Sequence, residues 1–504
     1  MIKIKNIKDL IETFRNEKKI ALVYNGKKIS YENLYNDIIS FSYEISTKSK
    51  KKGFNIAVVL KDDYEVIISL FAIIYSGSVP LLISEKDFFL NVKDFKKIYK
   101  INKIVVNKNY KNKNFLKKDI IRFSTKTNIN WKNFEYVKKI KLKKGDTALI
   151  LLTSGTTGFK KGVILSHNNL LFTSLNLNKF MNLKKNVCEY LMAPLTNSFG
   201  FARMRSIFLK KGCLIIDNGF FNPLLMLQRL KEHNINSISG VPSSFAMLLS
   251  LPSHSLIKLR KSLIWMEIGS ASMEKYFKLK LLKLFNKQII AYHYGLTEAS
   301  RSSLINLRND FKKITTVGKA SKGVEISICD ENRKIIKKKN FIGEIVVKGK
   351  NIAKGYVNGN FKNFQSGRFF TGDLGSVDQD GYLTIHGRID DLMNIGGVKI
   401  SPNLIEKIIH KNISMRCEFA IQNSHIKDSI LGNRIALYID KNIEMNNLLK
   451  KINNIIIKNG IPKEGKIKDV FYVKKFPKTL NGKLKRKEIY KNISNTIFSA
   501  NDYL

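Results

Sequence analysis

The first 150 residues alternate short apolar runs with stretches whose apolar positions repeat at helical spacing. The runs at residues 56–60 and 79–83 predict strands, and the segment 65–75 between them predicts a helix. Ser30 precedes apolar positions at helical spacing and predicts a helix start. Strands separated by helices favour parallel sheets covered on both faces. The same rhythm predicts further strands at 213–216, 237–240, 263–268 and 288–291.

After about residue 317 the pattern changes to short strands separated by turns that contain Gly and Asp. These strands are predicted at 324–329, 343–347, 368–371 and 382–386, as in a small β-barrel. Beyond them we predict a separate α+β unit, whose helix at 401–410 opens with Ser401 and Pro402. The predicted fold class is therefore α/β. A large N-terminal domain of two helix-covered sheets plus a small β-barrel (residues 1–388) precedes a small α+β domain (residues 389–504).

Composition restricts the class of protein. A chain of 504 residues is too long for one compact core, so two or more domains are expected. The net charge of +49 has two explanations: a polyanionic partner such as nucleic acid or an anionic membrane, or a lysine-rich composition without a binding role. The lysines are spread along the chain rather than gathered in one stripe. This favours the second explanation, and we predict no specific nucleic-acid partner.

The cysteines and the apolar runs indicate the cellular compartment in which the protein is expected. The four cysteines lie far apart without metal-binding spacing, which favours a reducing compartment: Cys188, Cys213, Cys329 and Cys417. The charged start of the chain lacks the apolar core of a signal peptide. The longest apolar stretch, residues 66–83, is interrupted by Ser, Gly and Pro and predicts a buried helix and strand rather than a membrane span. We therefore expect a cytoplasmic protein with no transmembrane segment.

Residues 151–163, LLTSGTTGFKKGV, lead from an apolar strand into a loop of glycines and hydroxyls that ends in two lysines. The glycines let the backbone approach a polyanion closely, the hydroxyls donate hydrogen bonds, and the lysines add positive charge. The residues concerned are Ser154, Gly155, Thr156, Thr157, Gly158, Lys160, Lys161 and Gly162. The order differs from the P-loop of common NTPases. A polar surface turn would explain a few of these residues but not the set, so the segment predicts a phosphate-binding loop.

Four further segments join this one. They read YHYGLTE (292–298), TGD between two predicted strands (371–373), GRIDD with GGVK shortly after it (387–391 and 396–399), and PKTLNGKLKR (477–486). In order and spacing the set resembles the adenylate-forming superfamily, which comprises acyl-CoA synthetases, adenylation domains of carrier-protein systems and firefly-type luciferases. The resemblance covers nearly the whole chain.

The resemblance implies ATP and Mg²⁺ as cofactors. It places the nucleotide on Thr153, Ser154, Gly155, Thr156, Thr157, Gly158, Lys161, Tyr294, Gly295, Asp373 and Arg388. Within this set Tyr294 would stack on adenine and Asp373 would accept the ribose hydroxyls. The implied catalytic residues are Thr297 at the α-phosphate, Glu298 as the Mg²⁺ ligand, and Lys483 between the substrate carboxylate and the α-phosphate. Lys160 departs from the family pattern, where most relatives have Pro.

The resemblance also implies that residues 389–504 are mobile and present two faces to one active site in turn. Asp390 would be the hinge. In one state Lys483 would face ATP, and in the other Gly397 and Lys399 would line a tunnel for a pantetheine thiol. The paired glycines at 396 and 397 equally fit a plain hairpin turn.

The acid pocket is expected in the segment after residue 193, and the implied pocket residues are Asn197, Phe199, Val241 and Gly269. No acidic residue lies between 193 and 205 to pair with the ammonium of an amino acid, although Glu267 lies in another wall segment. Arg203 and Arg205 lie on the helix expected to border the pocket. Pointing inward, either would favour an acid with a second anionic group; the alternative is that each pairs with a nearby carboxylate.

We therefore predict an acid–thiol ligase of the acyl-CoA synthetase type. It would activate a small carboxylic acid as an acyl-adenylate with release of pyrophosphate, and then transfer the acyl group to CoA or to the phosphopantetheine of a separate acyl carrier protein. One alternative is a stand-alone adenylation enzyme that loads an amino or hydroxy acid onto a carrier protein. A remote alternative is a non-catalytic polyanion-binding protein on a ligase scaffold.

Overall fold

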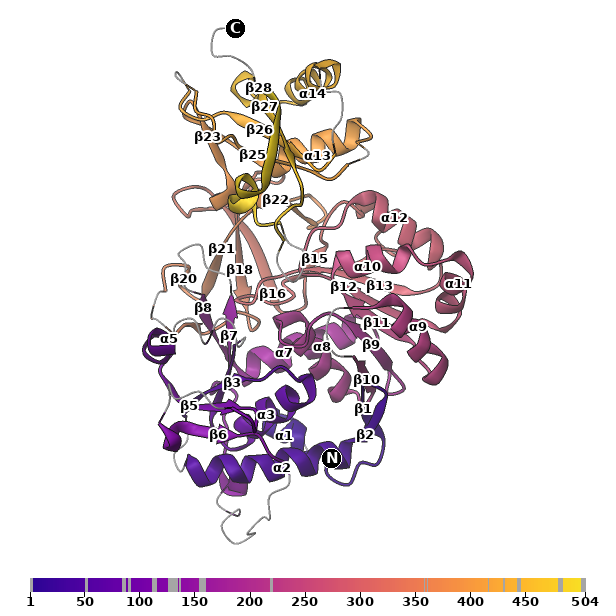
Figure 1. The fold of residues 1–504 in the computed structure, drawn as a ribbon, viewed down its shortest axis with the longest axis vertical. Coiled ribbons are helices and arrows are strands. Elements are labelled where there is room, and N and C mark those ends of the chain that lie inside the picture. Colours follow the sequence, from indigo (N-terminus) through magenta and orange to yellow (C-terminus); the bar gives the residue numbers. More distant parts are fainter. Residues whose placement is uncertain are drawn as a thin grey trace. The chain divides into compact units, whose positions relative to one another are not determined.

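The structure is a computed structural model of the chain (Figure 1). It describes residues 3–49, 53–83, 88, 92–110, 116–125, 135, 137–153, 160–217, 221–357, 359, 361–415, 417–428, 431–441, 446–478 and 484–499. The chain forms two compact units: Met1–Ile326 with Val347–Phe370, and Ser327–Val346 with Thr371–Leu504.

The first unit contains a nine-stranded sheet whose six central strands are parallel and whose edges are antiparallel. Buried residues fill the central strands on both faces, as expected when helices cover a parallel sheet (Figure 1). In spatial order the strands are β15 (Lys319–Ala320), β14 (Ser303–Asn306), β13 (Ile289–Tyr294), β12 (Trp265–Ile268), β11 (Ser237–Gly240), β9 (Cys188–Met192), β10 (Cys213–Ile216), β1 (Ile20–Tyr24) and β2 (Lys27–Ser30).

A seven-stranded sheet is the second layer of this unit. Its five strands from β7 to β6 are parallel, and β8 and β19 are antiparallel at the other edge. In spatial order the strands are β19 (Gly355–Tyr356), β8 (Lys161–Ser166), β7 (Thr147–Thr153), β4 (Val79–Leu82), β3 (Asn55–Val59), β5 (Ile101–Val106) and β6 (Ile120–Arg122). The two expected helix-covered sheets are therefore confirmed.

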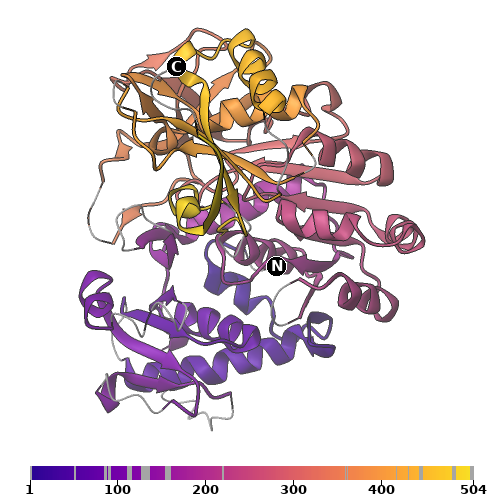
Figure 2. The same cartoon turned by 45° about the horizontal axis from the view of Figure 1, so that its top comes forward.

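Several helices of the first unit begin at a side chain that caps them, namely α1, α2, α3, α7 and α9. Ser30 precedes α2, and its hydroxyl accepts from the backbone N–H of Asn33 at 3.0 Å. Figures 1 and 2 show α2 and α3 packed side by side. The helices are α1 (Ile7–Glu12), α2 (Tyr31–Lys48), α3 (Asp63–Tyr75), α5 (Val92–Ile98), α7 (His167–Phe180), α8 (Ser198–Leu209), α9 (Pro223–Glu232), α10 (Pro242–Leu249), α11 (Ser253–Ser262) and α12 (Lys275–Leu284), with short 3₁₀ turns at Lys117–Asp119 and Phe311–Lys313.

The small barrel expected after residue 317 corresponds to a six-stranded sheet. Its strands are β17 (Ile335–Ile336), β16 (Val324–Cys329), β18 (Gly343–Gly349), β21 (Arg368–Val377), β20 (Phe364–Gln365) and β22 (Leu383–Arg388). The prediction that Thr371, Gly372 and Asp373 lie between strands is wrong, because β21 continues through them. Gly372 keeps the strand going with a φ of +71°, which its missing Cβ permits. A register shift follows between Leu374 and Gly375.

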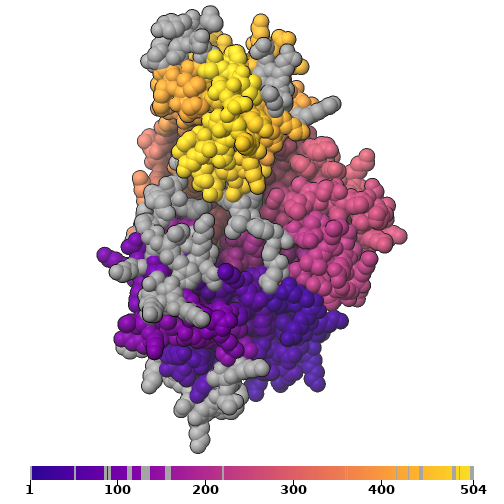
Figure 3. All heavy atoms as spheres, viewed as in Figure 1, coloured from indigo at the N-terminus to yellow at the C-terminus, as the bar shows by residue number. Residues whose placement is uncertain are grey.

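The rest of the second unit is the expected α+β structure. A four-stranded sheet and two helices share one apolar core, to which Ile405, Leu437 and Ile452 belong. Its strands are β25 (Phe419–Asn423), β26 (Ile435–Ile439), β27 (Ile467–Val473) and β28 (Ile493–Ser499); its helices are α13 (Pro402–Asn412) and α14 (Asn446–Lys458). A hairpin of β23 (Met393–Ile395) and β24 (Val398–Ile400) precedes α13, with 3₁₀ turns at Ile389–Asp391, Lys463–Gly465 and Arg486–Asn492. On the face shown in Figure 3, the last, yellow part of the chain lies at the surface, and β28 is only partly buried.

Two expectations about organisation have different outcomes. The apolar stretch 66–83 is a buried helix and strand, and none of the helices in the described part of the chain is both long and apolar enough to cross a membrane. The domain boundary expected between Arg388 and Ile389 stays a prediction. The movement of residues 389–504 about that boundary stays a prediction.

Candidate active site

The two ends of the expected phosphate-binding loop lie side by side in the seven-stranded sheet. Thr153 ends β7 and Lys161 begins β8, and the two residues are register partners. Behind them the ring of Tyr99 packs within 3.0 Å of a Cβ placed on Gly162, so this position favours glycine. The expected phosphate contacts between them lie outside the described residues: Ser154, Gly155, Thr156, Thr157 and Gly158.

Glu298 lies just after β13, where the YHYGLTE segment leaves the nine-stranded sheet. Its side chain is buried, and the Tyr356 hydroxyl donates to its Oε1 at 2.9 Å. The same Tyr356 ring lies 5.4 Å from the Nζ of Lys161. Lys161 and Glu298, distant in sequence, therefore meet at one aromatic side chain in the first unit. Tyr356 was not predicted as a site residue, and its only sequence signal is the Gly-Tyr pair that forms the short edge strand β19.

Tyr294, Gly295 and Thr297 lie on the same segment. Tyr294 ends β13 beside Ser303 of β14. Gly295 is followed by a tight turn, because a Cβ added there would lie 2.4 Å from the backbone nitrogen of Arg301. Thr297 lines a small cavity of the first unit. The segment therefore places these three residues with Glu298 at the end of one strand.

Asp373 and Arg388 form a pair in the second unit. They are register partners on β21 and β22, and NH1 of Arg388 lies 3.1 Å from Oδ1 of Asp373. Asp373 is buried and Arg388 is partly exposed. The structure thus brings together Asp373, expected to accept the ribose hydroxyls, and Arg388, expected to contact the nucleotide, with the carboxylate held by the guanidinium.

The other expected residues of the second unit lie on a 3₁₀ turn and on the β23–β24 hairpin. Asp390 lies in the 3₁₀ turn Ile389–Asp391. Gly397 and Gly396 form the β23–β24 turn with φ of +86° and +56°, and the Nζ of Lys399 lies 2.9 Å from Glu331. This geometry is a hairpin, the alternative left open above, and a thiol tunnel stays a prediction. Lys483 lies outside the described residues.

Three of the four expected acid-pocket residues lie close together. The Phe199 ring stacks on the His293 ring with centroids 5.6 Å apart and an interplanar angle of 11°. A Cβ added to Gly269 would lie 2.0 Å from Cε1 of the same His293. Gly269 donates its N–H to the carbonyl of Gly240, the residue before Val241, at 3.3 Å. Asn197 is the N-cap residue of α8, which carries Phe199.

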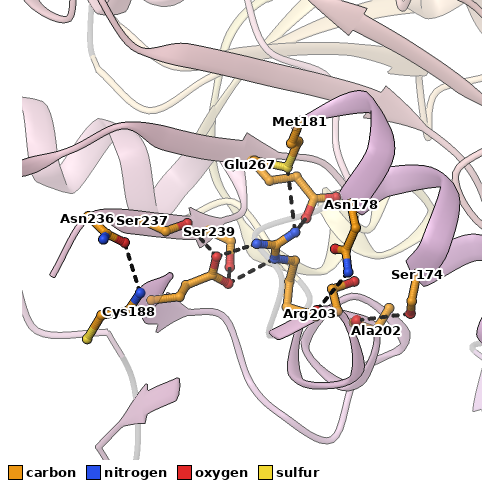
Figure 4. Close-up of polar contacts among 12 residues, drawn as sticks. Ser174, Asn178, Met181, Cys188, Ala202, Arg203, Asn236, Ser237, Ser239 and Glu267 are labelled. Carbon is orange, nitrogen blue, oxygen red and sulfur yellow. Dashed lines mark hydrogen bonds and ion pairs between the residues drawn. The ribbon is translucent and has the colours of Figure 1, made fainter. Parts of the chain in front are cut away.

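Behind this wall lies a group of buried charged side chains, here called the buried cluster: Glu189, Arg203, Glu267, His293 and Arg301. Arg203 donates from Nε to Glu189 at 2.8 Å, and its NH1 lies 3.1 Å from Glu267 (Figure 4). Glu267 also receives Arg301 Nε at 2.9 Å. Of the two alternatives for Arg203, the structure therefore supports pairing with carboxylates.

The buried cluster is electrostatically coupled. Burial alone would raise the pKa of Glu267, but Arg301 and Arg203 lower it well below its usual value. Burial lowers the pKa of His293, whose Nδ1 lies 3.0 Å from Glu267. Hydroxyls complete the set, because Ser237 and Ser239 each donate to Glu189 at 2.6 Å (Figure 4). Both carboxylates are thus fully engaged by buried donors.

Comparison with known proteins identifies the family. The family model described as AMP-binding enzyme matches residues 12–357. The chain belongs to the AMP-binding enzyme family. The oxalate–CoA ligase of Saccharomyces cerevisiae is 30% identical over 353 residues, which is 68% of this chain but only 63% of that relative. The 2-succinylbenzoate–CoA ligase of Bacillus cereus is 25% identical over 94% of this chain and 96% of its own length.

Solved structures with this fold cover nearly the whole chain. The o-succinylbenzoate CoA synthetase of Bacillus subtilis, in complex with ATP and magnesium ion, superposes with a TM-score of 0.78 at 20% identity, covering 95% of this chain and 99% of that one. ATP-bound MatB from Rhodopseudomonas palustris gives 0.80 at 22% identity, covering 96% and 98%. The predicted membership of the AMP-binding enzyme family and the predicted fold class are confirmed.

Proposed function

We propose that this protein activates a carboxylic acid with ATP and then transfers the acyl group to the thiol of coenzyme A. In the first reaction a carboxylate oxygen attacks the α-phosphorus, the bond to pyrophosphate breaks, and an acyl-adenylate forms. In the second reaction the thiolate attacks the acyl carbon, AMP leaves, and the thiol proton passes to solvent. Family membership and relatives named as CoA ligases support this proposal.

The observation that carries the proposal is the meeting of Lys161 and Glu298 at Tyr356. In the first reaction two anions approach each other, so positive charge must be held against the phosphates. Lys161 at the end of the phosphate loop would supply it. Glu298, with one oxygen fixed by Tyr356, suits a Mg²⁺ ion held by one carboxylate and nucleotide phosphates, and that ion would neutralise the departing pyrophosphate.

The remaining roles are proposals from the family pattern. Thr297 would donate to the α-phosphate, Tyr294 would stack on adenine, and Asp373 would accept the ribose hydroxyls while Arg388 holds its carboxylate in place. Lys483 would neutralise charge where the acid meets the α-phosphate. Asp390 would be the hinge that exchanges the faces of residues 389–504 between the two reactions.

The relatives support the reaction type more closely than they identify the thiol acceptor or the acid substrate. Relatives named as CoA ligases support CoA rather than a separate carrier protein. Their names range from oxalate to long-chain fatty acid, so they do not identify the acid. An amino acid is disfavoured, because Glu267 is engaged by Arg203 and Arg301 and cannot also pair with an ammonium. The cytoplasmic location stays a prediction.

ATP–pyrophosphate exchange across a panel of carboxylic and amino acids tests the proposal. We expect exchange with at least one carboxylic acid, and CoA-dependent formation of AMP with the same acid. Lys483→Ala should lower exchange by at least about 100-fold. The matched control is Lys485→Ala, which removes an exposed lysine paired with Glu488 and should leave exchange unchanged. Absence of exchange with every acid would refute the proposal, and transfer to a holo carrier protein but not to CoA would reassign the acceptor.

A further inference from the structure

Arg205 is a buried cation without a carboxylate partner in the described part of the chain. It lies on α8 two residues after Arg203 and is 3% exposed. Its NH1 donates to the carbonyl of Phe201 on its own helix at 3.0 Å, and its guanidinium lies 4.5 Å from the Phe201 ring. Its Nε is buried and has no hydrogen-bond partner among the residues that the structure describes. An unpaired buried charge costs free energy, so this arrangement calls for a counter-charge.

The buried cluster cannot supply that counter-charge. Its two carboxylates, Glu189 and Glu267, are balanced by Arg203 and Arg301, and burial lowers the pKa of His293. Burial and the nearby Arg301 lower the pKa of Arg205 to about 9, which still leaves the guanidinium positive at neutral pH. Among the described residues of the first unit, no neighbouring carboxylate therefore compensates the positive charge of Arg205.

Arg205 lines a small cavity that also touches the expected reaction centre. Its polar walls include Ser198, Thr297, Ser300 and Asn351, and its apolar walls include Leu151 and Leu170. Thr297 is the residue expected at the α-phosphate, and Ser198 opens the helix that carries Phe199 of the acid-pocket wall. The cavity is thus next to both the expected phosphate site and the expected acid site.

A water molecule would satisfy the hydrogen bonds here but not the charge. The cavity has room for about one water, and in the described part of the chain neither Asn351 Oδ1 nor Arg205 Nε has a hydrogen-bond partner. A single water could bridge such a donor and acceptor, yet the guanidinium would stay uncompensated. We propose that Arg205 binds a second anionic group on the acid substrate, and that this substrate is a short dicarboxylic acid. This inference rests on the proposed function, since it names the substrate class of that same site.

The walls of the expected acid pocket favour a substrate with a short chain between its two acid groups. Phe199 and Gly269 close on His293, and the buried cluster fills the space behind that ring. A long apolar chain would have to displace paired, buried charges, which is costly. A second carboxylate directed at Arg205 needs only the small cavity beside Thr297 to widen.

The test compares matched diacids and monoacids in ATP–pyrophosphate exchange. The probes are oxalate, malonate and succinate against acetate, propionate and butyrate, with octanoate as the long-chain probe. The full-length protein should prefer at least one diacid over its matched monoacid by about 10- to 100-fold, the range expected for a charged hydrogen-bonded contact. Arg205→Met, which keeps a long apolar stem, should abolish that preference. Arg205→Lys should retain part of it, because the charge remains but the fork-shaped geometry is lost.

A binding measurement separates failure of this inference from failure of the proposed function. The best diacid should raise the thermal midpoint of the native protein and not that of Arg205→Met, whether or not exchange occurs. Arg205→Met alone should leave the midpoint unchanged or higher, whereas Arg203→Met, the matched change at a paired position, should lower it. The inference would be overturned if the native protein preferred monoacids or octanoate, or if Arg205→Met lost exchange activity equally with diacids and monoacids. It would also be overturned if the thermal midpoint of Arg205→Met fell as far as that of Arg203→Met, which would indicate a structural arginine bridged by water.

Discussion

Replacing Arg203 with Met tests whether charge pairing holds the buried cluster together. Met fills much of the same volume but removes the cation that Glu189 and Glu267 share. Removing one partner of a buried ion pair costs about 3–5 kcal/mol, because the other charge stays buried and unpaired. Arg203 is fully buried and contacts both carboxylates, so we expect a loss within this range rather than the small cost of a surface pair.

The expected loss converts into a measurable shift. The first unit has about 350 residues, and at about 2.1 cal/mol/K per residue its total unfolding entropy is roughly 0.7 kcal/mol/K. A loss of about 3–5 kcal/mol therefore lowers its thermal midpoint by about 4–7 °C. Thermal unfolding followed by tryptophan fluorescence suits this measurement, because Trp265 is buried on β12 two residues before Glu267. A midpoint within about 1 °C of the native protein would mean that charge pairing does not hold the buried cluster together.

Two controls isolate charge from packing. The double variant Arg203→Met with Glu189→Gln leaves Arg301 balanced by Glu267, and should recover at least about half of the lost stability if charge is the cause.

The pH dependence of the midpoint difference has a definite sign. In the native protein Arg301 and Arg203 lower the pKa of Glu267, so its contribution is present above about pH 4.5 and is lost as the pH falls towards the lowered value. Without Arg203 the buried Glu267 carboxylate protonates more readily, so the gap between variant and native midpoints should narrow as the pH falls from about 7.5 to about 5. A gap that widens would contradict this account.

Three further side chains or glycines provide tests of local interactions in the two units. Tyr356→Phe removes the hydrogen bond to Glu298 but keeps the ring, so kcat/KM for pyrophosphate exchange should fall about 10- to 100-fold with the thermal midpoint nearly unchanged. Gly269→Ala should lower the midpoint by several degrees, since its Cβ would overlap an imidazole, whereas Gly145→Ala, with nothing within 4 Å, should not. Burial and then a nearby lysine lower the pKa of His386 to about 4, so stability of the second unit should fall as the pH drops from about 6.5 to 4, and urea titrations of His386→Gln should show a flatter dependence.

Local patterns predicted the elements well, because strand and helix signals depend on neighbouring residues. The strands 213–216, 237–240 and 324–329 have the predicted limits, and Ser401 and Pro402 open α13 as expected. The TGD segment was misplaced for a local reason too. Gly and Asp are typical turn residues, and only the pairing of β21 with β22 shows that the strand continues through them.

The site residues divide in a similar way. Segments that carry several unusual residues in a row, such as 292–298, could be found from their order alone. Tyr356 could not, because a Gly-Tyr pair is common and its importance comes from Lys161 and Glu298, which lie far away in sequence. Its contacts exist only once β19 pairs with β8 at the edge of the seven-stranded sheet.

Arg203 and Arg205 show most clearly what one chain segment cannot specify. Both are long cations on one helix, and two residues correspond to about 200° of rotation, so they must face different surroundings. Arg203 meets Glu189 and Glu267, which β9 and β12 contribute. Arg205 meets a cavity wall that includes residues of α7. Arg203 finds two carboxylates and becomes part of the core, while Arg205 finds hydroxyls and apolar groups and stays uncompensated. The role of a buried charge is therefore set by where its counter-charges come from, and for Arg205 the missing one would have to arrive with the substrate.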